Sequence, residues 1–463
     1  MAYGSPTSAP APSEAERNRR EQRAWYYYDW ANSGYVTTVA TVLFAPYLTA
    51  VAETAACGAA GTSTDPCSTS LRLLGLNVSP GSLVFYIVTL ATIVSAFVLP
   101  IVGAIADRSS RKKTIMAGFA WTGSAFAGAM FLVTGSDWLL GAGLLFGANI
   151  CLGASVVVYD AILCEIATPD ERNAVSSRGW AMGYLGGGLL LTVNLAVVSF
   201  HEALGLSEGM AVRICLLSAA AWWAGFTVIP YLRIRNRPVA LHVDASGGLF
   251  RRSFGQLAAT LKDLRSFPTT LRFLLAYLFF NDGIQTVIAV SSTYGEKELG
   301  FTKEVLIATI LIVQFVAFGG ALLFGRIAAV RGSKATIVGG LVAWMAVVVT
   351  AFVLPSDRIA PFLVLAVVIG IVLGGTQALS RSLFSQLIPR GREAEYFSLY
   401  QACERGTSWL GTLTFGLVHQ LSGSYRPAII SLIVLFVVGL AIFLRVDPRR
   451  GIAEAGNPVP TTV

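Results

Sequence analysis

Long apolar runs, interrupted by glycine, proline and charged residues, set the pattern of this chain. A helix needs about 20 apolar residues to cross a bilayer, and the runs are long enough for twelve such spans. The spans are expected at 31–53, 82–106, 114–134, 138–163, 179–200, 212–232, 272–292, 304–325, 335–354, 361–383, 397–420 and 426–445. The pattern therefore predicts an all-α polytopic membrane protein.

Composition supports this class and excludes two others. Of the 463 residues, 54% are hydrophobic and only 13% are charged, whereas soluble domains carry about 25% charged residues. The chain therefore lacks the charged shell of a soluble protein, and its apolar content excludes a disordered one. Residues 1–23 are polar and lack the apolar segment of a secretory signal, so we expect the first span to be retained.

The positions of Lys and Arg predict the orientation. If the N-terminus is cytoplasmic, 26 of the 34 Lys and Arg residues lie in cytoplasmic segments and six lie in or beside external loops. Because short cytoplasmic loops are enriched in positive charge, we expect both termini on the cytoplasmic side of the plasma (inner) membrane. The basic clusters flank apolar spans, which argues against a nucleic-acid partner despite the net charge of +8.

Internal repeats indicate a duplicated six-helix unit. The pattern Asn-x-Gly-x-x-Thr at 32–37 recurs at 281–286, 103–115 matches 325–337, and 168–174 matches 388–394. The matching segments of the first pair lie farther apart in the chain than those of the other two pairs. One insertion in the first external loop explains this difference. Two parallel six-helix halves are common among secondary transporters. The expected domains are a cytoplasmic N-tail (1–28), an N-terminal bundle (29–232), a basic cytoplasmic linker (233–271), a C-terminal bundle (272–445) and a cytoplasmic C-tail (446–463).

The basic linker admits two interpretations. Its segment 253–267 has apolar residues at helical spacing, which is typical of a helix on the membrane surface. The alternative is a plain tether whose charges only fix the topology.

The loop after the second span carries an Asp-Arg pair and a basic cluster. Asp107 and Arg108 precede Arg111, Lys112 and Lys113. The segment resembles the signature loop of the major facilitator superfamily, although serine stands at 110 where that family usually has glycine. An aspartate here can face a helix N-terminus and the basic residues can pair across the two halves, which would latch a cytoplasmic gate. The alternative is a topology signal only.

Three further stretches resemble one branch of that superfamily. They are YYYDWANSGYVTTV (26–39), PDERNAVSSRGWAMGYLGGG (169–188) and GGTQALSRSLFSQLIPRGREAEYFSLYQ (374–401). Together they resemble the vacuole-effluxer-like branch, named for fungal autophagy-related vacuolar amino acid effluxers. The resemblance implies the twelve-helix major facilitator fold and export of amino acids or similar small solutes.

Ionisable residues inside the spans are candidates for coupling, because each is costly in a bilayer unless it is paired or hydrated. Asp282 lies about 15 Å into the seventh span and Glu404 about 11 Å into the eleventh. Since burial favours the neutral form of a carboxylate, Asp282 is the first candidate for proton coupling and Glu404 the second. A structural bond to a neighbouring helix is the alternative for Asp282. The remaining charged residues, expected to be interfacial caps or pairing partners, are Asp29, Asp160, Arg381 and Arg405.

Polar residues of the spans supply candidates for the solute cavity, centred on the first helix of each half. They are Asn32, Thr37, Tyr184, Asn194, Asn281, Gln285 and Gln377. The cysteines and histidines show no metal-ligand spacing, so we expect neither a metal nor another cofactor. Cys57 and Cys67 share one external loop and are predicted to form a disulfide, the alternative being two free thiols.

Taken together, the sequence predicts a secondary active transporter that moves a small polar solute by alternating access. We expect the proton as the coupling ion and a monomer in the lipid bilayer. The sequence contains no phosphate-binding loop or nucleophile motif, so neither an enzyme nor an ATP-driven pump is expected. Two other classes remain as alternatives, a membrane-embedded lipid-handling protein or enzyme and a receptor that does not transport.

Overall fold

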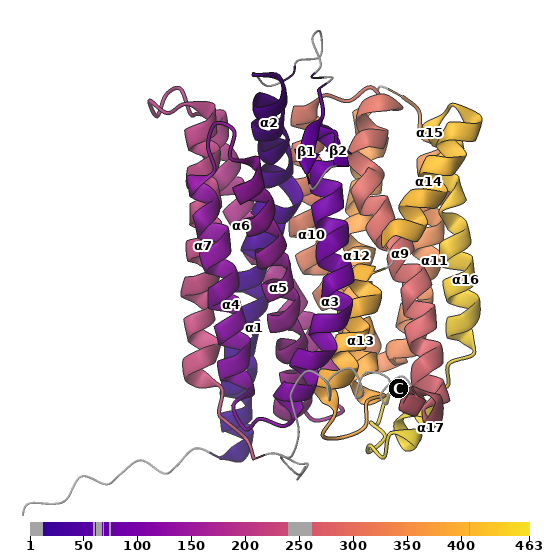
Figure 1. The fold of residues 1–463 in the computed structure, drawn as a ribbon. Helices are drawn as coiled ribbons and strands as arrows, with labels where there is room; N and C mark the ends of the chain where they lie inside the picture. Colours follow the sequence, from indigo (N-terminus) through magenta and orange to yellow (C-terminus); the bar gives the residue numbers. More distant parts are fainter. Residues whose placement is uncertain are drawn as a thin grey trace, which may run out of the picture.

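The structure, a computed structural model, describes residues 13–58, 61, 67, 69–73, 76–238, 262–356, 358–406 and 408–463. Its helices run side by side in two bundles, the first half up to residue 238 and the second half from residue 262 (Figure 1). The start of α1 and helix α17 lie at one end of the bundles, here named the terminal face, and the strands lie at the opposite face (Figure 1). Residues 1–12 of the predicted N-tail and 239–261 of the predicted linker, with most of its candidate surface helix, are outside the described residues.

The described residues of the first half form seven α-helices, a π-helix, two short 3-10 turns and a two-stranded hairpin. In order these are α1 (Glu14–Tyr35), the π-helix η1 (Val36–Leu43), α2 (Phe44–Cys57), β1 (Leu71–Leu73), β2 (Leu76–Val78), η2 (Pro80–Ser82), α3 (Leu83–Asp107), α4 (Lys112–Ala129), η3 (Met130–Leu132), α5 (Trp138–Ile166), α6 (Arg172–Ser199) and α7 (Glu208–Arg233). The strands are antiparallel.

Among the described residues of the second half, every regular element is a helix. Its elements are η4 (Leu264–Ser266), α9 (Pro268–Lys297), α10 (Lys303–Arg331), α11 (Ser333–Val353), α12 (Ile359–Gln386), α13 (Glu393–Gly406), α14 (Ser408–Ser422), α15 (Tyr425–Ser431), α16 (Ile433–Leu444) and α17 (Pro448–Glu454). Matching sequences occupy matching turns, since 103–115 covers the α3–α4 turn and 325–337 the α10–α11 turn.

The helices confirm the predicted fold class. Among the described residues, eleven helical segments are long and apolar enough to cross a membrane. The segment predicted as the eleventh span, 397–420, is formed by α13 and α14 and completes six membrane segments in each half. The chain is therefore an all-α membrane protein of two six-helix halves.

One local feature differs from the expected boundaries, and a second agrees with the sequence analysis. Helix α1 begins at Glu14, inside the predicted N-tail, because Ser13 and Glu16 form a capping box with hydrogen bonds of 3.1 and 3.3 Å. At the opposite face, Cys57 is joined to Cys67 by a disulfide with a Cα–Cα distance of 6.0 Å.

Small residues bring α10 and α12 into backbone contact. A Cβ at Gly374 would lie 2.2 Å from the carbonyl oxygen of Ala317, and one at Gly320 would lie 2.4 Å from that of Ile371. Only glycine allows two helices to approach this closely. The packing fixes the position of α12, whose one charged residue, Arg381, points toward the first half.

Candidate functional site

Asp107 ends α3 on the terminal face and contacts the second half. Its carboxylate accepts hydrogen bonds from the backbone N–H groups of Ala394 (3.0 Å) and Glu395 (2.9 Å), in the first turn of α13. Such N–H groups have no partner within their own helix and lie at the positive end of its dipole. This is the kind of contact that the sequence analysis expects, and a gating role stays a prediction.

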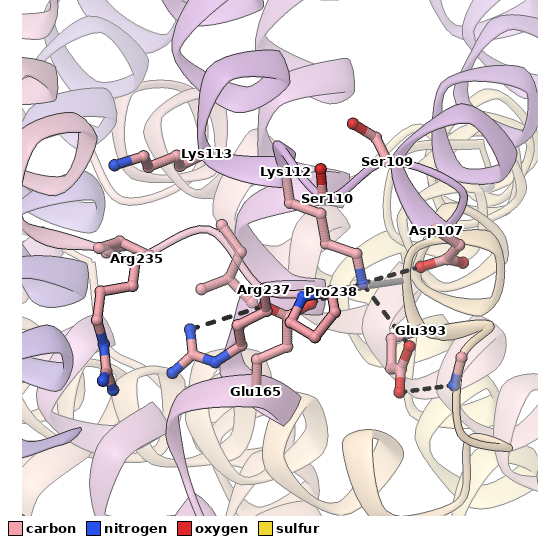
Figure 2. Close-up of a pocket in the computed structure, with 13 residues that line it drawn as sticks. Asp107, Ser109, Ser110, Lys112, Lys113, Glu165, Arg235, Arg237, Pro238 and Glu393 are labelled. Carbon is pink, nitrogen blue, oxygen red and sulfur yellow. Dashed lines mark hydrogen bonds and ion pairs between the residues drawn. The ribbon is translucent and has the colours of Figure 1, made fainter. Parts of the chain in front are cut away.

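Lys112, in the first turn of α4, joins carboxylates of both halves. Its Nζ lies 3.1 Å from Asp107, 2.9 Å from Glu165 and 3.8 Å from Glu393, the first residue of α13. Figure 2 shows the lysine pointing toward Asp107 and Glu393. These residues line a cavity of about 150 Å³ together with Ser109, Ser110, Lys113, Arg235 and Arg237.

The other members of the predicted basic cluster are arranged differently. The Lys113 ammonium lies 5.7 Å from the centre of the Tyr231 ring, within the first half. Arg108 and Arg111 are exposed on the α3–α4 turn. Lys112 contacts the second half through Glu393.

The repeat-equivalent turn of the second half uses neutral groups in place of charges. A Cβ at Gly103 would lie 2.5 Å from the Ala394 carbonyl oxygen, and one at the equivalent Gly325 would lie 2.6 Å from a hydroxyl of α6. Beside Gly325, the Ser333 hydroxyl donates to Asn173 Oδ1 at 2.9 Å. Both turns therefore pack closely on the facing half. Among the described residues, the first does so through a carboxylate and the second through the Ser333 hydroxyl.

The loop before α13 is held by Arg392. Its guanidinium pairs with Glu395 at 3.0 Å and with Asp263. Burial alone would lower the pKa of Arg392, but hydrogen bonds and attraction from Glu395 and Asp263 raise it. The arginine therefore stays charged beside the helix N-terminus that Asp107 contacts.

Arg381 of α12 projects into the first half. Its Nη2 lies 3.0 Å from Asp29 Oδ2 on α1, and its Nη1 lies 3.3 Å from Asp160 Oδ1 on α5. Its Nε donates to the Ser176 hydroxyl on α6 at 3.0 Å. Because Arg381 and Asp160 are 2% and 1% exposed, these are buried ion pairs between the halves. Of the two interpretations left open for Asp29 and Asp160, the structure shows pairing.

Three aromatic rings of the first half surround the Arg381 guanidinium. Its central carbon lies 4.8 Å from the ring centre of Trp25, 5.3 Å from that of Trp180 and 5.5 Å from that of Tyr159. The faces of such rings attract a cation, most strongly where water is excluded. The rings therefore add to the carboxylates in holding Arg381.

Gln401 of α13 extends this network. Its amide Nε2 donates to Asp160 Oδ2 at 3.1 Å and to Glu404 Oε2 at 2.9 Å, while its Oε1 accepts from Arg405 Nε at 3.2 Å. We name the whole set the charged cluster. It consists of Asp29, Asp160, Arg381, Gln401, Glu404 and Arg405.

Two predicted cavity residues of the second half adjoin the charged cluster. Asn281 Nδ2 donates to the backbone carbonyl of Glu404 at 3.2 Å, and Gln377 Nε2 donates to Asn281 Oδ1 at 2.8 Å. The Tyr277 hydroxyl donates to Gln377 Oε1 at 3.3 Å. A chain of polar side chains therefore leads from α9 and α12 to the cluster.

The remaining predicted cavity residues do not join that chain in the described structure. Asn32 and Thr37 donate to backbone carbonyls at 2.7 Å, and Thr37 also lies 3.2 Å from a carbonyl of α6. Asn194 bonds to hydroxyls of η1 and α7 at 3.4 and 2.9 Å. Tyr184 packs 5.6 Å from the Trp180 ring, and Gln285 is partly buried on α9.

Asp282 is fully buried but its partner lies in its own half. Its Oδ2 accepts a hydrogen bond of 2.7 Å from the backbone N–H of Gly411, in the first turn of α14. Its other carboxylate oxygen has no partner among the described residues. The structural bond to a neighbouring helix, which the sequence analysis left as the alternative, is present.

Sequence reasoning missed several members of this network. Gln401, Ser176 and the aromatic rings around Arg381 were not singled out. A signal existed for Gln401, since it precedes Glu404 by three residues and therefore shares its helix face. No comparable signal marks Ser176, because its role depends on contact with α12.

Comparison with solved structures shows which class of protein has this fold. The chain superposes on the proton:xylose symporter XylE with a TM-score of 0.68 at 11% identity, covering 96% of this chain and 99% of that one. It superposes on a bacterial homologue of the iron transporter ferroportin, in an outward-facing state, with a TM-score of 0.64 at 13% identity, covering 93% and 98%. The fold is that of the major facilitator transporters.

Sequence comparisons then define the family. A family model described as "Vacuole effluxer Atg22 like" matches residues 17–456, so the chain belongs to that family. It is 31% identical over 451 residues to an uncharacterized MFS-type transporter, YxiO, of Bacillus subtilis, covering 96% of this chain and 99% of that protein. It is 29% identical to autophagy-related protein 22 of Yarrowia lipolytica over 63% of this chain and 54% of that protein. The predicted family and secondary-transporter class are confirmed.

Proposed function

We propose that this transporter exports an amino acid or a similar small polar solute by alternating access. The observation that carries the proposal is the position of the polar contacts between the halves. Asp107 with α13 and Arg381 with Asp29 and Asp160 gather toward the terminal face. Contacts of this kind can close one face and must separate when that face opens. The vacuole-effluxer family supports the direction and the solute class.

The proposal includes the orientation and the membrane. The terminal face is the cytoplasmic face of the plasma membrane, and the disulfide loop faces the outside. Lys and Arg are concentrated in the two tails and in the loops expected on the same side of the membrane, which supports this assignment. The solute crosses without chemical conversion, and a proton gradient supplies the driving force.

Counterflow in proteoliposomes tests the transport step. Vesicles loaded with one unlabelled amino acid should accumulate the same labelled amino acid for at least one member of a panel. A matched glycine pair then tests the role of the terminal face. Gly103→Ala places a Cβ 2.5 Å from the Ala394 carbonyl oxygen, whereas Gly118→Ala on α4 meets nothing within 4 Å.

We expect Gly103→Ala to reduce exchange strongly and Gly118→Ala to match the wild type. An imposed pH gradient should concentrate the solute in the wild type. No counterflow for any amino acid or related polar solute would contradict the proposed solute class. Equal exchange by the two glycine variants would contradict closure of the terminal face through α3 and α13.

A further inference from the structure

The charged cluster contains one more carboxylate than it has guanidinium groups. Its acids are Asp29, Asp160 and Glu404, and its bases are Arg381 and Arg405. Asp160 is 1% exposed and Arg381 is 2% exposed. Charges in such surroundings are stable only when they are paired and hydrogen-bonded. The cluster therefore has room for one additional positive charge.

The surplus carboxylate can be located from the hydrogen bonds. Asp29 and one oxygen of Asp160 face Arg381 directly. The other oxygen of Asp160 and one oxygen of Glu404 share a single amide nitrogen of Gln401, at 3.1 and 2.9 Å. Two carboxylates held by one nitrogen repel each other, and a proton between them removes that repulsion.

We propose that Asp160, Gln401 and Glu404 form a proton-binding site that controls separation of the two halves at the terminal face. A proton from water binds a carboxylate oxygen of this triad and returns to water when both carboxylates ionise again. Because Arg381 and Asp160 belong to different halves, neutralising Asp160 weakens the attraction that holds the halves together. The inference rests on the alternating access of the proposed function but not on the identity of the solute.

Other titratable groups interact with the triad from several of the helices packed around it. They are Asp29 on α1, Tyr159 on α5, Tyr184 on α6, Tyr277 on α9, Arg381 on α12, and Tyr400 and Arg405 on α13. The Asp29 carboxylate opposes a further negative charge on the triad, and the two arginines favour it. The triad is distinct in that its two acids come from different halves and are joined by one neutral amide.

A native thiol reports on separation without knowledge of the solute. Cys164 of α5 is partly buried, with its Sγ 3.7 Å from the Ser385 carbonyl oxygen of α12 in the other half. Maleimide labelling of Cys164 in the purified full-length protein, measured peptide by peptide with mass spectrometry, therefore follows opening of the terminal face. Labelling of the unfolded protein at each pH corrects for the chemistry of the thiol.

In the wild type we expect corrected labelling to rise as the pH falls from about 8 to about 5.5, because proton binding favours opening. Asp160→Asn should raise labelling about tenfold at the higher pH and flatten the profile, because it removes the carboxylate that Arg381 attracts across the halves. Glu404→Gln should also flatten the profile, because one of the two carboxylates that share a proton is gone, but it should not raise labelling at the higher pH, because it removes only the charge that repels Asp160. Gln401→Met keeps every charge but removes the hydrogen bonds that Gln401 donates to the two carboxylates. Since those bonds favour the charged carboxylates, the variant should move the midpoint of the labelling profile to higher pH.

Asp282→Asn is the matched control, a buried acid bonded within one half. It should keep the wild-type midpoint. The inference is overturned if wild-type labelling ignores pH, or if Asp282→Asn flattens the profile while Glu404→Gln and Gln401→Met leave it unchanged. If Asp160→Asn does not fold, the Glu404→Gln and Gln401→Met profiles decide. Failure of counterflow with a pH-dependent Cys164 profile would reject the proposed solute and leave the proton site intact.

Discussion

Asp282 and Arg381 are both buried charges, but they differ in where their partners lie. Asp282 accepts a hydrogen bond from Gly411 in its own half. Arg381 reaches Asp29 and Asp160 in the other half. A bond within one half moves with that half when the two rock, whereas a bond between the halves must break. The depth of a charged residue in the membrane therefore shows that it needs a partner, and the location of the partner decides whether it can control transport.

The largest expected effect concerns the central charge between the halves. Arg381→Met leaves the Asp29 and Asp160 carboxylates without their arginine, and loss of one partner from a buried ion pair costs about 3–5 kcal/mol. We expect a marked loss of thermal stability in detergent, measured by intrinsic fluorescence. Adding Asp160→Asn to Arg381→Met should restore part of it. If Arg381→Met alone is as stable as the wild type, the ion pairs contribute little to stability, and the aromatic packing stabilises this region instead.

A covalent contact within one half should change stability without changing the conformational balance. Cys57→Ser opens a loop closed across ten residues, which should cost about 2–3 kcal/mol at most. Labelling of Cys164 should stay at the wild-type level in the folded protein. In the wild type, neither Cys57 nor Cys67 should react with maleimide before reduction, and reaction of both would contradict the disulfide.

Sequence reasoning reached the fold because hydrophobic length, charge bias and internal repeats are properties of segments. It also placed Asp107 near a helix N-terminus, since a recognisable loop carries that residue. It could not decide between coupling and structural roles for Asp282, because depth along a helix does not give the direction of a side chain. Nor could it pair Arg381 with Asp29, which is 352 residues away in the chain. Such a pair exists only once α12 is packed against the first half.

Asp107 makes a contact between the halves that we expect to contribute less free energy than the ion pairs of Arg381. Asp107→Asn keeps an oxygen for one N–H group of α13 but loses the charge that attracts Lys112. Hydrogen bonds to charged groups contribute about 1.5–3 kcal/mol, so we expect a substantial rise in Cys164 labelling. The protein should remain folded, as judged by size-exclusion chromatography. If Asp107→Asn shows wild-type labelling and normal counterflow, the loop after α3 acts only as a topology signal and has no gating role.

Asp282→Asn should have a smaller effect, because asparagine can still accept the hydrogen bond from Gly411. We expect a stability change below about 1 kcal/mol. Accumulation under a pH gradient separates the two candidate coupling sites. If Asp282 is the coupling site, the first candidate of the sequence analysis, this variant should lose accumulation and keep downhill exchange. The proposed Asp160–Glu404 site predicts that both persist. Loss of accumulation with a normal Cys164 profile would assign coupling to Asp282 and leave only gating to the charged cluster.

The smallest expected effect comes from an exposed contact between the halves. The segment after α17 crosses the terminal face, where Asn457 donates to the carbonyls of Gln386 and Ile388 at 2.9 and 2.7 Å. Farther along, the Thr461 backbone N–H and hydroxyl donate to Asp170 of the first half at 2.7 and 2.8 Å.

Because these groups are solvated, Asp170→Ala should change stability by less than about 0.5 kcal/mol. It should nevertheless increase Cys164 labelling by up to about twofold, since a contact of this strength shifts a two-state balance by about that factor. Glu208→Ala, an exposed acid on α7 near the opposite face, is the control and should change neither quantity. If Asp170→Ala lowers stability but leaves labelling unchanged, the segment after α17 only covers the terminal face, and the contacts that control opening are limited to Asp107 and the charged cluster.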